Sequence, residues 1–133
     1  MTKSSNPTRG FTVTGKTREA VLTFLANALE RKFSEAERAL EDVKTMSFSD
    51  EEYRAGYINA LEGILLSVRS GDERDFFNRV EFNRSSMKKY IEDFKKFKGS
   101  PIRTNWDLGF FSAWTDLLNY RINTDNDPKK QST

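Results

Sequence analysis

The chain has 133 residues and a formal net charge of +2, and 13% of its residues are aromatic, which favours a folded protein over a disordered one. It contains no cysteine and no histidine. This excludes disulfides, the usual zinc sites, Ser–His or Cys–His nucleophile pairs and the Glu-x-x-His signature of di-iron bundles. There is no apolar run long enough for a membrane span and no signal-peptide core at the N-terminus. We therefore expect one cytoplasmic domain that is not an enzyme and holds no cofactor.

The first half of the chain predicts a polar arm followed by two helices. Residues 1–14 show no periodicity and are expected to form a flexible arm. From Lys16 to Met46 apolar side chains recur every three or four residues, which predicts one long amphipathic helix. Ser49 and Glu52 form a capping-box pattern at the start of a second helix, and Gly71 suits its end. The apolar stripe of the first helix consists of Leu22, Leu25, Leu29, Phe33, Ala36, Leu40 and Val43.

The second half predicts two more helices. Asp72 and Asp75 are expected to cap a third helix that runs to about Lys98, with a kink at residues 83–86. Thr104 is expected to cap a fourth helix that ends near Ile122, before a disordered tail over residues 123–133.

Two of the predicted helices share a sequence pattern. "YRAGYINALEGILL" begins at Tyr53 and "WDLGFFSAWTDLLN" begins at Trp106, and both carry an aromatic residue, a glycine and an alanine at matching positions. We interpret this as a duplicated hairpin, with repeats 16–70 and 72–122 inside one helical domain over residues 15–122. The expected fold is all-α, a four-helix bundle built from two pseudo-repeated antiparallel helical hairpins.

The repeat also predicts where two helices meet. The pairs Gly56/Ala60 and Gly109/Ala113 put small residues one turn apart, which lets two backbones approach closely. We expect the second and fourth helices to cross at these glycines. The alternative is that each small pair only makes room for an aromatic side chain of a neighbouring helix.

Residues 85–103 form the most basic region of the chain, with a local charge of +4. Cations on a helix and the loop after it can neutralise phosphates. The N-terminal residues Lys3, Arg9, Lys16 and Arg18 add further positive charge. The alternative is a solvated face on which Glu92 and Asp93 pair with the lysines. The candidate nucleic-acid-binding residues are Arg84, Lys88, Lys95, Lys96, Lys98 and Arg103.

Other motifs predict less. The acidic start of the second helix suits the helix dipole better than a metal, and "TVTGKT" near Thr12 lacks the first glycine of a phosphate loop. On the fourth helix, a polar strip lies opposite a wide apolar arc, and it consists of Asn105, Ser112, Thr115, Asp116 and Asn119. The apolar surplus at the end of this helix, together with one aromatic side chain before the preceding loop, is the candidate partner-binding patch. Its residues are Tyr120, Ile122 and Phe97.

The phrases "GYINALEGILLSVRSGD" and "GFFSAWTDLLNYR", within residues 53–121, resemble a family of small archaeal helical proteins of uncharacterised function. This resemblance implies an accessory subunit of a DNA polymerase complex and supplies no site residues. With the basic region, it favours a non-catalytic helical interaction module that is an accessory subunit of a larger nucleic-acid-handling complex. The alternative is a self-associating bundle that binds a small ligand in an aromatic interhelical pocket, lined by Trp106, Phe110, Trp114 and Tyr57.

Overall fold

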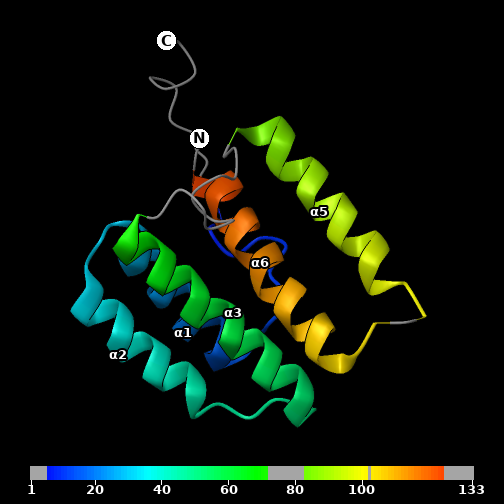
Figure 1. Cartoon of the computed structure of the whole chain (residues 1–133). Coiled ribbons are helices and arrows are strands. Elements are labelled where there is room, and N and C mark those ends of the chain that lie inside the picture. The colour runs from blue at the N-terminus through cyan, green and yellow to red at the C-terminus, as the bar shows by residue number, and fades with distance from the viewer. Residues whose placement is uncertain (1–5, 72–82, 102, 125–133) are drawn as a thin grey trace.

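The computed structural model describes residues 6–71, 83–101 and 103–124. Within these ranges the chain forms five α-helices and no strand (Figure 1). The predicted all-α class is therefore confirmed. The helices are α1 (Gly15–Leu29), α2 (Phe33–Lys44), α3 (Glu51–Ser70), α5 (Arg84–Lys98) and α6 (Asn105–Thr124).

The prediction of one long helix from Lys16 to Met46 is wrong, because the chain reverses between α1 and α2. Arg31 adopts the left-handed backbone conformation, with φ of 63°, and the N–H of Lys32 donates to the carbonyl of Asn27 at 2.8 Å. The two helices then pack against each other. The predicted count of four helices is therefore too low, and a simple pair of two-helix hairpins does not describe the fold.

The ends of the helices follow local side-chain chemistry, with one correction. The carboxylate of Asp50, and not the hydroxyl of Ser49, caps α3 by accepting a hydrogen bond from the N–H of Tyr53 at 2.8 Å. Gly71 ends α3 in the left-handed conformation, as predicted. The predicted fourth-helix cap is also present, since the Thr104 hydroxyl accepts from the N–H of Asp107 at 3.1 Å and the Asp107 carboxylate accepts from Thr104 N at 2.9 Å.

The predicted third helix is described only from residue 83 onward. Asn83 caps α5 by accepting a hydrogen bond from the N–H of Ser86 at 2.8 Å. The predicted kink at residues 83–86 is therefore the start of a helix. Residues 72–82, which include the predicted caps Asp72 and Asp75, lie outside the described residues.

Helices α3 and α6 cross at Gly56 and Gly109, as predicted. A Cβ atom added at Gly56 would lie 2.8 Å from the carbonyl carbon of Trp106, and one added at Gly109 would lie 2.8 Å from that of Tyr53. The contact is reciprocal, because Tyr53 and Trp106 occupy matching positions in the two similar segments. Only residues without a side chain allow the backbones to come this close.

The crossing pair α3 and α6 forms the centre of the molecule (Figure 1). Helices α1 and α2 pack together on one side, and their buried residues join those of α3 and α6 in one core. On the other side, α5 packs against α6 through a small cluster of Met87, Ile91 and Leu118, and its Tyr90 and Phe94 also pack against the main core. Helix α5 is thus an edge helix that turns most of its surface to solvent.

In the described part of the chain, no helix has both the length and the apolar character that crossing a membrane requires.

Candidate functional site

The predicted basic residues lie on edge helix α5 and in the loop that follows it. Arg84, Lys88, Lys95 and Lys96 are all exposed. Helix α5 buries only Met87 and Ile91, and its backbone packs against α6.

Two acidic residues of α5 pair with neighbouring lysines. Asp93 lies 3.5 Å from Lys89, and Glu92 lies 3.7 Å from Lys95 rather than beside Lys88 and Lys96, which are the other lysines in helical reach. All four side chains are about half exposed or more. Exposed pairs of this kind contribute about 0–1 kcal/mol, so they do not prevent these lysines from meeting an anion.

Lys98 and Arg103 serve the fold instead of an open basic surface. The ammonium of Lys98 donates to the hydroxyl of Ser112 at 3.3 Å, and burial lowers its pKa below the usual lysine value. The guanidinium of Arg103 donates through Nε to the carbonyl of Lys98 at 2.9 Å. These two contacts fix the connection between α5 and α6.

A groove of about 410 Å³ opens between α5, the end of α6 and the N-terminal segment. Its lining includes three basic residues, one acidic residue, two asparagines and two isoleucines. The guanidinium of Arg84 reaches across it to the carbonyl of Ile122 at 3.4 Å. The lining residues are Arg9, Gly10, Arg84, Lys88, Ile91, Glu92, Asn119, Ile122 and Asn123.

The N-terminal segment reaches the groove because α6 holds it. The side-chain amide of Asn123 donates to the carbonyls of Pro7 and Arg9, each at 2.9 Å, and the amide of Asn119 donates to the carbonyl of Gly10 at 3.1 Å. Residues 6–14, which the sequence assigns to a flexible arm, are therefore held along α6. Residues 1–5 and 125–133 lie outside the described residues.

A buried carboxylate completes this attachment. Asp116 is fully buried and accepts hydrogen bonds from Thr12 N at 2.6 Å, from the Thr12 hydroxyl at 2.8 Å and from the Tyr57 hydroxyl at 2.6 Å. Burial raises the pKa of Asp116 to about 6, although these hydrogen bonds and the charge of Lys98 oppose the rise. Burial, followed by the Asp116 charge, raises the pKa of Tyr57 well above its ordinary value. The carboxylate is enclosed by its donors, so we assign it a structural role.

The three candidate partner-binding residues are not gathered into one patch. Tyr120 is half-buried against the main core, and Ile122 packs against the small cluster under α5. Phe97 is 37% exposed, and its ring centroid lies 4.8 Å from that of Phe111. Leu66 of α3 is 66% exposed and was not among the candidates.

Neither the groove beside α5 nor a second pocket at the start of α1 is lined by the aromatic residues of the alternative hypothesis, Tyr57, Trp106, Phe110 and Trp114. Tyr57 and Trp114 are buried in the core, and Trp106 stacks on Phe110 with centroids 5.2 Å apart. The second pocket, of about 390 Å³, lies at the start of α1 instead. It is lined by Thr12, Val13, Thr14, Thr17, Ser47, Phe48, Ser49 and Tyr53.

Among the described residues, no cluster of three or more acidic side chains is placed to hold a metal ion. The chain matches no protein-family model, no curated protein and no solved structure. The function is therefore inferred from the surface of the protein.

The sequence identifies Arg9 only as a cation on a flexible arm, and not as part of this groove. Arg9 reaches α5 through the contacts of Asn119 and Asn123 with the N-terminal backbone. No sequence pattern marks such amide-to-carbonyl contacts, because an asparagine that bonds to backbone and one that is solvated by water have the same identity in the sequence.

Proposed function

We propose that this chain is a non-catalytic helical interaction module that acts as an accessory subunit of a nucleic-acid-handling complex and contacts the phosphate backbone through α5. The observation that carries the proposal is a row of exposed cations on one side of an edge helix. Arg84, Lys88 and Lys95 are spaced by four and seven residues, which keeps them on one side of α5. Lysine and arginine in such a row neutralise phosphates without reading sequence.

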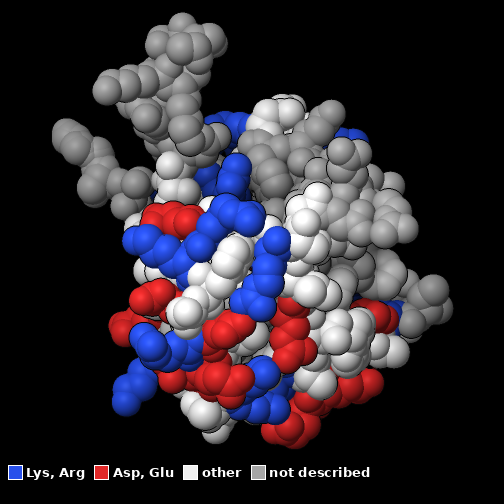
Figure 2. Space-filling model, turned by 60° about the vertical axis from the view of Figure 1, so that its left-hand side comes forward, with Lys and Arg blue, Asp and Glu red and all other residues white. Residues whose placement is uncertain are grey.

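The opposite side of the molecule has a different charge pattern. Turning the α2 side toward the viewer shows Lys and Arg intermingled with Asp and Glu over the described surface (Figure 2). Several of these charges are paired, as in the contacts of Lys44 with Glu41 at 3.2 Å and with Glu62 at 3.1 Å. Helix α5 also carries two such pairs, but its six basic residues outnumber its two acidic residues, so α5 is the stronger candidate for a polyanion.

The duplication hypothesis belongs to the same proposal. In it, α2–α3 and α5–α6 are the two copies, and α1 is an additional helix packed on the first copy. The reciprocal glycine contact between α3 and α6 supports this. The same alignment pairs Lys88 with Glu37 and Arg84 with Phe33. Lys95 aligns with Lys44, so Arg84 and Lys88 are the two cations of the row that occur in the second copy alone, as expected if that copy acquired a separate binding role.

A charge-reversal experiment tests the function. A triple variant Lys88→Glu/Lys95→Glu/Lys96→Glu is compared with Arg18→Glu/Lys32→Glu/Arg38→Glu, a control with the same change in net charge at exposed residues of α1, α2 and their connection. We expect the α5 variant to lose binding to a fluorescent oligonucleotide at low salt and the control to keep most of it. Absence of binding by the unmodified protein at low salt would contradict the proposal.

A further inference from the structure

We infer that the groove between α5, the end of α6 and the N-terminal segment is a phosphate-binding site, formed by Arg9, Arg84 and Lys88, that holds one phosphate group of a single-stranded nucleic-acid backbone. This inference rests on the proposed function and adds a specific site to it. It also gives the N-terminal segment, through Arg9, a direct part in binding.

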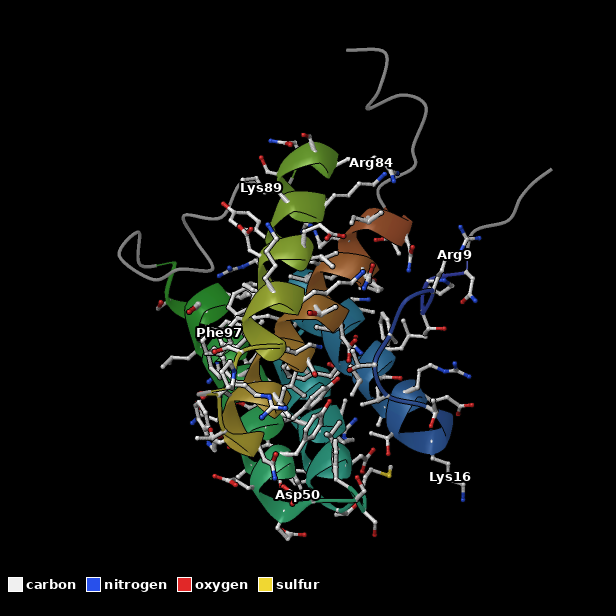
Figure 3. All side chains as sticks on the ribbon, turned by 90° about the vertical axis from the view of Figure 1, so that its right-hand side faces the viewer. Arg9, Lys16, Asp50, Arg84, Lys89 and Phe97 are labelled. Carbon is white, nitrogen blue, oxygen red and sulfur yellow. The ribbon has the colours of Figure 1, made fainter. Side chains whose placement is uncertain are left out.

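The three cations come from two separate parts of the chain and line one groove. Arg84 and Lys88 are one helical turn apart on α5, while Arg9 lies on the segment that runs along α6. Arg84 extends from α5 over the end of α6, toward the side of the molecule where Arg9 lies, and Lys89 lies on the other side of α5 (Figure 3). A phosphate in the groove would meet positive charge from both sides.

The balance of charge in the groove favours an anion. Among the described residues, Glu92 is the one acidic residue of the lining, and its carboxylate lies 3.7 Å from the ammonium of Lys95. Guanidinium groups match the geometry of phosphate oxygens and bind them through paired N–H donors. Two arginines and a lysine around one opening therefore fit a phosphate better than a neutral ligand.

The fold fixes Arg9 at this place. The carbonyls of Pro7, Arg9 and Gly10 accept hydrogen bonds from Asn119 and Asn123, so the two amides position the segment. Gly10 has a φ of 84°, and a Cβ atom added to it would lie 2.9 Å from the side chain of Asn119. The glycine thus permits both the turn and the close approach to α6.

The shape of the surface favours a strand of nucleic acid over an isolated phosphate. Ile91 and Ile122 also line the groove, and these apolar side chains can contact a sugar or a base. Beyond the groove, Lys95 continues the same side of α5. A basic groove followed by further cations is the arrangement with which proteins follow a single-stranded backbone.

The test uses three single variants of the full chain, Arg9→Gln, Arg84→Gln and Lys88→Gln, with Lys89→Gln as the matched control from the other side of α5. Binding of a fluorescent single-stranded DNA of about 12 nucleotides is measured by anisotropy from about 50 to 200 mM salt. Each groove variant is expected to weaken binding several-fold and to reduce the slope of log K against log salt by about 0.7. The control is expected to leave the slope unchanged.

Three outcomes would overturn the inference. Equal effects of Arg9→Gln and Lys89→Gln would mean that only net charge matters, which removes the groove but leaves the proposed function. If a poly-glutamate peptide competes as strongly as unlabelled DNA, the groove is a binding site for acidic proteins and not for nucleic acid. No binding by the unmodified protein would remove the proposed function as well. Thermal unfolding of each variant checks that a lost contact is not lost folding.

Discussion

The crossing of α3 and α6 gives the sharpest prediction, which is that Gly109→Ala destabilises the protein. The added Cβ would lie 2.8 Å from the carbonyl carbon of Tyr53, 2.9 Å from Tyr57 N and closer still to the Tyr53 carbonyl oxygen. An ordinary contact needs more than 3.4 Å. The obstacle is helix backbone, which cannot rotate away as a side chain can, so the two helices must separate by about 1 Å or more.

The expected cost follows from two opposing effects. Overpacking of a tight contact costs about 1–3 kcal/mol and more where backbone must move, while alanine gains about 1 kcal/mol over glycine in a helix. We expect a net loss of about 2 kcal/mol in the free energy of unfolding, and a fall in Tm of about 6–8 °C for a chain of this size. Urea denaturation followed by circular dichroism at 222 nm measures the first quantity, and a thermal scan measures the second.

A glycine in the same helix pair serves as the control. Gly63 is exposed within α3, and a Cβ atom added there would meet nothing within 4 Å. Gly63→Ala should therefore stabilise the protein by about 0.5–1 kcal/mol. Gly56→Ala should resemble Gly109→Ala, and the double variant should cost less than the sum of the two, since one separation relieves both contacts. A Gly109→Ala protein as stable as the unmodified one would refute the close approach of the two backbones.

Three further predictions concern the buried carboxylate, a helix cap and the N-terminal segment. Because the folded-state pKa of Asp116, about 6, lies above its ordinary 3.8, its contribution to stability is full below about pH 3.8 and is lost as the pH rises through 6. Asp116→Asn should remove about 2.4 kcal/mol from the difference in unfolding free energy between pH 4 and pH 7, and an unchanged difference in urea titrations would contradict this. Asp50→Ala should lower the free energy of unfolding by about 1 kcal/mol in urea titrations, while Ser49→Ala should change it little. Equal losses in the two variants would mean that Ser49 also caps α3. Asn123→Ala should speed tryptic cleavage after Arg9 several-fold, since it removes two hydrogen bonds to the segment; an unchanged cleavage rate would show that other contacts hold it.

Much of the helical framework could be predicted because its signals are local. Gly71 marks a helix end, since few other residues adopt its left-handed conformation. Thr104 marks a helix start because its hydroxyl reaches the N–H of Asp107. The glycines Gly56 and Gly109 pointed to the crossing of α3 and α6 because two similar segments placed small residues at the same positions.

The reversal between α1 and α2 could not be predicted from such signals. Apolar residues keep a spacing of three and four residues through Leu29, Phe33 and Ala36. The turn between them contains neither glycine nor proline, and its left-handed residue is Arg31. A continuous helix and a tight antiparallel pair therefore predict the same pattern, and only packing against α3 and α6 distinguishes them.

The attachment of the N-terminal segment could not be predicted either, because its partners occupy a polar strip of α6. Ser112, Thr115 and Asp116 lie opposite the apolar arc and yet are buried. A polar residue satisfied by a hydrogen bond inside a protein has the same identity in the sequence as one solvated by water. The Asp116 carboxylate is satisfied in the core because Thr12, which is distant in the chain, donates two hydrogen bonds to it.

The surroundings of the basic residues in the fold could not be predicted from the sequence either. Counting charges along residues 85–103 gives Lys98 and Arg103 the same weight as Lys88, but the first two are used in the connection to α6. Arg9, far away in sequence, lines the groove with Lys88 and Arg84. A phosphate site built in this way depends on the folded position of the N-terminal segment. Loosening that segment by Asn123→Ala should therefore weaken oligonucleotide binding as Arg9→Gln does, even though Asn123 carries no charge. If Asn123→Ala releases the segment and leaves binding unchanged, Arg9 contributes no contact in the groove.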